Sequence, residues 1–149
     1  GDLVAPEARL RESLAMRRRL YPEGHTSIAT DLYNLARLMF ARGDLAQAEP
    51  LYRDAAELYE RTQGKDYWLT ANARMGLGRT LTGLRRFGEG EGELLAAERV
   101  LASAQGVPAG RHQQCVEALV ALYEAWEKAE PGRGHAVAAA TWQARRGPQ

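Results

Sequence analysis

Apolar residues recur along the chain at a short helical period and again at a long period of 42 residues. Within each apolar segment they fall three and four positions apart, which places their side chains on one face of an α-helix. On the long period Leu35, Leu77 and Leu119 correspond to one another, and their neighbours repeat in type. The matching small residues, twenty positions further on, are Ala55, Ala97 and Ala139. The pattern predicts an all-α chain built of repeated units.

Each unit divides into two amphipathic helices. In the first complete unit we expect helices over 26–42 and 45–62, because the residues between them favour a break. Gly43 suits the left-handed position after a helix, Asp44 is a good N-cap, and Gln47 completes a capping box with it.

The second unit has a less favourable turn. Its helices are expected over 68–84 and 87–104, on either side of the segment Leu84-Arg85-Arg86. Gly88, Gly90 and Gly92 follow that turn, and glycine weakens a helix. We therefore expect the helix over 87–104 to be locally loose.

Partial units flank the two complete ones. Residues 6–21 match the second helix of a unit whose first helix is missing, which favours a segment cut from a longer protein. A helix over 111–129 opens the last unit, and its partner is expected to begin near Gly134. The predicted organisation is a single array over 1–149, with the half unit at 6–21, repeats at 26–62 and 68–104, and a capping repeat at 111–146.

The register of the last helix stays open between two alignments. The strict 42-residue spacing puts Gly132 where Ala48 stands in the first unit, whereas Ala136 offers the better side chain for that position.

Small residues such as Ala36 and Gly78 among large ones such as Leu35 and Tyr52 resemble the pattern of the tetratricopeptide repeat. The period and the string GDLAQAEPLYRDAAELYERTQGKDY at 43–67 resemble the kinesin light chain type of this repeat, as found in bacterial multidomain proteins. The string LVALYEAWEK at 119–128 is similar to the terminal unit of arrays that follow bacterial serine/threonine kinase domains.

This resemblance implies a right-handed superhelix, an α-solenoid of about seven helices in antiparallel pairs, with the first helix of each pair lining a concave groove. It also implies a non-catalytic module that binds a peptide or a partner protein in that groove. An alternative is an intramolecular regulatory or scaffold segment of a larger bacterial signalling protein, such as a serine/threonine kinase.

Candidate binding residues lie on the first helix of each unit, away from the core stripe. They are Thr30, Tyr33, Asn34, Arg37, Asn72, Met75, Arg79 and Glu117. Arg37 and Arg79 occupy the same position in successive units, so two guanidinium groups would stack along the groove and favour an acidic peptide. Asn34 stands in the stretch LYNLA, where the family usually has LNNLA and uses asparagine for the peptide backbone.

Two other interpretations of the groove charges remain open. Arg37 could instead pair with Asp31 or Glu49, leaving its charge neutralised within the protein. Glu117 and Glu124 in the last unit would make one end of the groove acidic and the other basic.

Five aromatic side chains fall on inward stripes and are expected in the core. For Trp68 and Trp142 the pattern leaves both core packing and contact with a ligand open. The five are Tyr52, Tyr59, Phe87, Tyr123 and Trp126.

Composition limits the partners. The chain has 20 basic and 19 acidic residues, so bulk charge indicates neither a nucleic acid nor an anionic membrane as partner. No apolar run approaches the roughly 20 residues needed to cross a bilayer. Cys115 is the one cysteine, which a reducing compartment permits, and the cytoplasm is therefore expected.

One pair of residues suggests chemistry. His112 and Cys115 are three positions apart on one helix face, so a thiolate nucleophile or half a metal site is an alternative interpretation. A structural zinc site needs four ligands, and one cysteine with three histidines in the whole chain gives little to build it from. We expect no enzyme, no metal and no cofactor.

Overall fold

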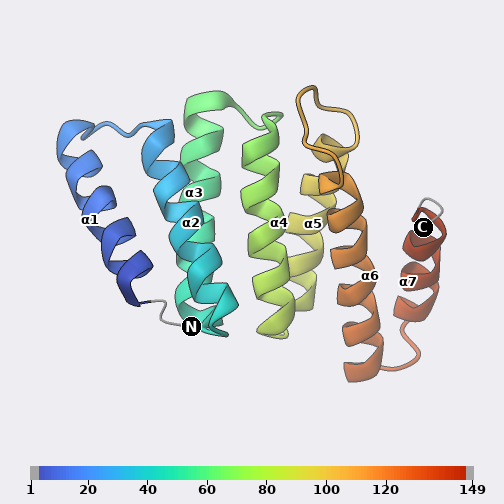
Figure 1. The fold of residues 1–149 in the computed structure, drawn as a ribbon. Coiled ribbons are helices and arrows are strands. Elements are labelled where there is room, and N and C mark those ends of the chain that lie inside the picture. The colour runs from blue at the N-terminus through green and yellow to red at the C-terminus, as the bar shows by residue number, and fades with distance from the viewer. Residues whose placement is uncertain (1–3, 147–149) are drawn as a thin grey trace.

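The computed structural model describes residues 4–146, which form seven helices and no strand (Figure 1). The helices are α1 (Val4–Leu20), α2 (Thr26–Ala41), α3 (Leu45–Gln63), α4 (Trp68–Gly83), α5 (Phe87–Leu101), α6 (Arg111–Ala129) and α7 (His135–Ala144). We call α2, α4 and α6 the front helices and the other four the back helices. The predicted all-α solenoid is confirmed.

Each front helix packs on the back helix before it and on the one after it. Front helices also contact one another, α2 with α4 and α4 with α6, whereas no two back helices within residues 4–146 do so. The front helices are therefore closer together, and the array bends towards them. Figure 1 shows α2, α4 and α6 side by side with α3 and α5 behind them.

Most helix ends lie within two residues of the sequence-based expectation. The exception is α5, which ends at Leu101 rather than at 104. The N–H groups of Ser103 and Ala104 both donate to the Val100 carbonyl, at 3.2 and 2.8 Å, and these bonds close the turn that terminates the helix.

The last helix keeps the 42-residue spacing where its side chains reach the core. Ala139 is buried, as are Ala55 and Ala97, whereas Ala136 is exposed. Gly132 lies before the helix in a left-handed turn with φ of +80°. The strict 42-residue alignment is therefore correct. The position equivalent to Ala48 is Gly132, which lies before the first residue of α7, His135.

Equivalent residues occupy equivalent environments. Leu35, Leu77 and Leu119 are 2%, 2% and 0% exposed, each on the inner face of a front helix. Four of the five aromatic residues expected in the core are buried, and the fifth, Trp126, is half-buried between Phe87 and His135. Trp142 is buried as well, and Trp68 packs against the same core cluster from its edge.

Glycines set the distance between α4 and α5. A Cβ atom on Gly78 would lie 2.5 Å from Cγ of Leu94, and one on Gly90 would lie 3.0 Å from Cδ1 of Leu122 and 3.2 Å from the Gly78 carbonyl oxygen. We expected the glycines of 88–92 only to loosen α5. Gly90 also lets α5 approach α4 and α6 closely, because it has no side chain between them.

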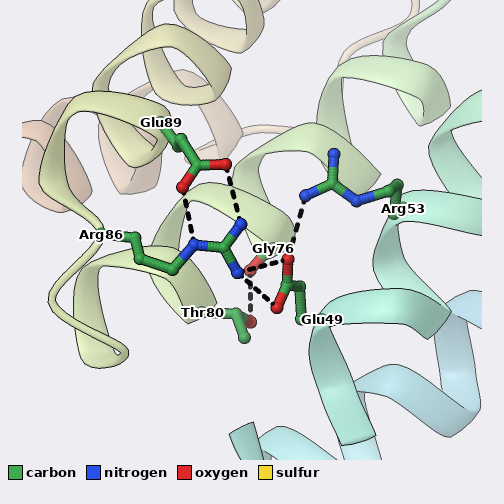
Figure 2. Close-up of polar contacts among 6 residues, drawn as sticks. All are labelled: Glu49, Arg53, Gly76, Thr80, Arg86 and Glu89. Carbon is green, nitrogen blue, oxygen red and sulfur yellow. Dashed lines mark hydrogen bonds and ion pairs between the residues drawn. The ribbon is translucent and has the colours of Figure 1, made fainter. Parts of the chain in front are cut away.

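An ion network joins the first complete unit to the second (Figure 2). Arg86, which precedes α5, donates to both carboxylate oxygens of Glu49 on α3 at 2.7 Å and to Glu89 at 2.6 and 2.8 Å. Glu49 also accepts from Arg53 at 3.0 Å. Hydrogen bonds from the Arg86 guanidinium lower the pKa of Glu89 below its ordinary value. The turn at the start of α5 is thus tied to the preceding back helix.

One core position carries an arginine. Arg74 corresponds to Leu32 and Val116, which are both buried, but its guanidinium binds Glu60 on α3 and, at 3.4 Å, Glu93 on α5. The arginine therefore adds a second ionic link between α3 and α5, besides the one that Arg86 makes.

The two turns within the complete units use the same backbone geometry with different residues. Gly43 has φ of +80°, and its equivalent Arg85 has φ of +61°. In the first turn Asp44 caps α3 by accepting from the N–H of Gln47 at 3.2 Å, as expected. The capping box is altered, because the Gln47 amide donates to the Asp44 carboxylate at 2.6 Å instead of reaching back to its N–H.

We expect Arg85→Gly to raise the free energy of unfolding by about 0.5–1 kcal/mol, because glycine adopts a left-handed conformation without the Cβ clash. The matched exchange Gly43→Arg should lower it by a similar amount, since open space around Gly43 leaves backbone strain as the cost. Urea denaturation monitored by circular dichroism measures both. A less stable Arg85→Gly protein would contradict the assignment of strain to this turn.

We also expect Arg74→Leu to retain the stability of the wild type within about 1 kcal/mol, because an apolar residue replaces partly exposed ion pairs at a core position. Arg74→Ala should be about 2 kcal/mol less stable than Arg74→Leu, since both variants leave the same carboxylates unpaired but only alanine leaves a cavity at the core position. Equal losses in the two variants, measured by the same denaturation, would show that the ion pairs themselves hold the back helices.

Candidate functional site

A groove of about 510 Å³ opens on the front face of the array. Three front helices and one back helix supply its walls and floor. The lining residues are Tyr33 and Arg37 on α2, Tyr52 on α3, Asn72, Met75, Gly76 and Arg79 on α4, and Arg111, Gln114, Glu117, Ala118 and Ala121 on α6.

Six of the eight candidate residues line this groove, and Thr30 and Asn34 do not. The Thr30 hydroxyl instead donates to the Thr26 carbonyl at 3.0 Å and lies 2.8 Å from the Tyr59 hydroxyl. Asn34 is half-buried outside the groove. The asparagine that the family resemblance pointed to is therefore displaced from the groove, and Asn72 is the asparagine within it.

Asn72 and Met75 form part of the groove floor rather than its rim. Their exposed fractions are 2% and 4%, although sequence reasoning placed them off the core stripe. The Asn72 amide nitrogen donates to the Tyr33 hydroxyl at 2.7 Å. Its carbonyl oxygen Oδ1 is buried, and no group within residues 4–146 donates a hydrogen bond to it.

Tyr52 closes the floor between α2 and α4. Its ring meets the Tyr33 ring edge to face, with the centroids 5.8 Å apart. Burial raises the pKa of Tyr52 above its ordinary value, while the charges of Arg79 and Arg37 act in the opposite direction. The phenol is therefore neutral in the folded protein.

Three arginines face the groove without a carboxylate partner among the residues that the structure describes. Arg37 lies over the Tyr33 ring, 5.9 Å from its centroid, and Arg79 lies 5.0 Å from the centroid of Phe40. Arg111 donates to the Gln114 side chain at 3.2 Å. Their charges are thus available to a ligand.

The alternative that Arg37 pairs with Asp31 or Glu49 is wrong. Asp31 accepts from Arg17 at 3.1 Å and from the Ser13 hydroxyl at 2.8 Å. Glu49 belongs to the network of Figure 2.

Of the two carboxylates that could make one end of the groove acidic, Glu117 lines the groove and Glu124 does not. Glu117 pairs with Arg146, at 3.6 Å between nitrogen and oxygen. Glu124 lines a separate pocket between α6 and α7. Arginine charge therefore dominates the groove.

Sequence reasoning missed several lining residues. Gln114 follows Asn72 at the repeat spacing, so the 42-residue period could have found it. Arg111 is the first residue of α6, outside the pattern of the other units, and its place depends on the path of the loop after α5. Tyr52 is a buried core residue on the back helix α3, and the periodicity of the sequence does not indicate that it reaches the groove floor.

The pair considered for catalysis does not form a reactive site. Cys115 is fully buried, and its thiol donates to the Leu94 carbonyl at 3.5 Å. Burial raises the pKa of the Cys115 thiol to about 12, which removes the thiolate at neutral pH. His112 instead contacts Glu98 at 2.8 Å. Within residues 4–146 no group of three or more His, Cys, Asp or Glu residues could hold a metal ion.

We expect this thiol to make stability depend on alkaline pH. The folded state favours the neutral thiol, so its contribution is complete below pH 9 and is lost as the pH rises towards 12. The loss should reach at most about 4 kcal/mol.

Between pH 9 and pH 12 the free energy of unfolding, measured by denaturation, should fall less steeply with pH for Cys115→Ala than for the wild type. The buried tyrosines are common to both proteins and therefore do not cause the difference. In parallel, alkylation at pH 8 should modify unfolded protein much faster than native protein. Rapid native labelling would show that the thiol is accessible.

Comparison with known families gives one match in two overlapping placements. Residues 7–61 and residues 27–89 each match the family model of the tetratricopeptide repeat, and together they span more than half of the chain. A search of curated proteins finds no match to this sequence. No helix in the described part of the chain has the length and apolar character of a membrane span.

Proposed function

This chain belongs to the tetratricopeptide repeat family, whose repeats generally mediate interactions between proteins, and we propose that its front groove binds an acidic segment of a protein partner. The observation that carries the proposal is the set of three arginines on one groove, Arg37, Arg79 and Arg111, without a carboxylate partner among residues 4–146.

An extended peptide suits this groove better than a compact small molecule. The lining residues come from three successive front helices, so the charged groups are distributed along the array rather than gathered at one point. Guanidinium groups bind carboxylates with two parallel hydrogen bonds, which gives orientation as well as attraction. Aspartate and glutamate side chains of a peptide would match this distribution.

The setting of the module is part of the proposal. The 42-residue period supports the kinesin light chain type of repeat, and the sequence similarity at 119–128 supports a larger bacterial signalling protein as its source. The free, buried thiol of Cys115 is compatible with the cytoplasm. An acidic segment of the same polypeptide would offer the groove the same chemistry as a separate partner.

We expect binding to acidic peptides to depend on the groove arginines. A fluorescent member of an array of heptapeptides, each with two Asp or Glu residues, should bind the wild type. Arg37→Ala and Arg79→Ala should each lower its affinity about fivefold, or roughly 1 kcal/mol, as expected for partly exposed ion pairs. Fluorescence anisotropy at two salt concentrations measures the loss, which should be smaller at high salt.

Arg9→Ala is the matched control, because Arg9 is exposed on α1 and does not line the groove. It removes the same charge and should leave affinity unchanged. Absence of binding across the whole array, or equal losses in all three variants, would refute the proposed site.

A further inference from the structure

We propose that Arg146 keeps the groove arginines free for an acidic peptide by holding Glu117, the carboxylate of the groove wall, in an ion pair of its own. This inference rests on the proposed function and specifies which residue protects the charge selectivity of that site. Arg146 acts through Glu117 and is a positioning residue rather than part of the binding surface, because it does not line the groove.

Glu117 is the residue that could oppose the binding of an acidic peptide. Among the described residues that line the groove it alone carries a carboxylate, and its side chain is 46% exposed. The same position holds Tyr33 in α2 and Met75 in α4, so α6 is the front helix that brings a negative charge to this part of the groove. A carboxylate in the groove wall repels acidic side chains and competes with them for guanidinium groups.

The groove arginines nevertheless have no carboxylate partner among the residues that the structure describes. Arg37 and Arg79 lie over aromatic rings, and Arg111 donates to an amide. Elsewhere in the chain arginines pair with carboxylates on neighbouring helices. A free Glu117 within the same groove would be expected to bind one of the three, so its engagement elsewhere is what leaves them available.

Arg146 provides that engagement. Its Nη2 lies 3.6 Å from Oε1 of Glu117, and this is the one ion pair of Glu117 among residues 4–146. The arginine side chain is 29% exposed and its Nε is buried, so the guanidinium lies against the protein and does not extend freely into solvent. Salt screens such a partly buried charge less than a fully exposed one. The pair therefore restrains Glu117 and neutralises its carboxylate.

The last helix brings this arginine to the groove wall. Arg146 directly follows the C-cap of α7, and its N–H donates to the Gln143 carbonyl at 3.1 Å. Apolar packing fixes α7, because Ala139 and Trp142 are buried in a core cluster that includes residues of α6. No residue of α7 lines the groove. The helix therefore controls one charge of the groove without forming any part of its walls.

Arg145 offers a matched comparison at the same helix end. Its guanidinium carbon lies 4.4 Å from the centroid of the Trp142 ring, and within residues 4–146 it forms no ion pair with Glu117. Removing either arginine takes one positive charge from the same end of α7. Only the loss of Arg146 releases Glu117, so the two substitutions separate the effect of that pair from the effect of charge alone.

The test uses the tightest-binding acidic heptapeptide of the array as its probe, with fluorescence anisotropy as the readout. Arg146→Ala should weaken binding of this probe about threefold, the size expected for one partly exposed ion pair. Arg145→Ala should leave affinity unchanged. Wild-type affinity in Arg146→Ala, or an equal loss in Arg145→Ala, would overturn the inference.

A double-mutant cycle shows whether Arg146 acts through Glu117. In a Glu117→Gln background no carboxylate remains to compete for the groove arginines, so the addition of Arg146→Ala should cause no loss of affinity. An undiminished loss in that background would mean that Arg146 acts through its own charge or through the fold. Such a result would contradict the inference even if Arg146→Ala by itself weakens binding.

Thermal melting and the groove arginines complete the test. Arg146→Ala should melt within about 2 °C of the wild type, because a partly exposed pair contributes little stability. If it melts lower, the cycle still decides, since Glu117→Gln cannot restore affinity lost by unfolding. If Arg37→Ala and Arg79→Ala weaken the probe and Arg146→Ala does not, the proposed function stands and this inference fails. If no acidic peptide binds the wild type, both fail.

Discussion

The groove depends on the packing of Tyr52 against Gly76. A Cβ atom at Gly76 would lie 2.3 Å from Cε1 of the tyrosine, so any larger residue would displace the ring. This contact joins the back helix of one unit to the front helix of the next, and it brings Tyr52 to the groove floor against Tyr33. The absence of a side chain at Gly76 thus lets two units pack closely and places the Tyr52 ring in the groove floor.

Charge is distributed unevenly over an almost neutral chain. Several arginines on the other surfaces bind carboxylates that tie one helix to another. Examples of such pairs are Arg17 with Asp31, Arg42 with Glu7, Arg74 with Glu60 and Arg86 with Glu49. The groove arginines instead lie over aromatic rings or beside an amide, which orients them without neutralising them. A net charge of +1 therefore conceals a basic front face.

Departures from the repeat pattern coincide with the places where the structure has something to recognise or to join. Gly76 stands where the first unit has Asn34, and the missing side chain leaves the space that the Tyr52 ring fills in the groove floor. Asn72 stands where the first unit has Thr30, and it donates to the Tyr33 hydroxyl in the groove. Arg74 stands where the first unit has Leu32, and it links α3 to α5. Such departures are typical of sites where function competes with uniform packing.

The sequence by itself determined the helices, their pairing and the core, because helical periodicity, small residues and a strict 42-residue spacing are local features that repeat. It also indicated Arg37 and Arg79 as groove residues, since they share a position in successive units. Only the tertiary structure decided which side chains meet across units. Asn34 lies outside the groove, Arg111 lines it and Tyr52 forms part of its floor. These positions depend on the angle and distance between helices, which residue spacing along the chain does not encode.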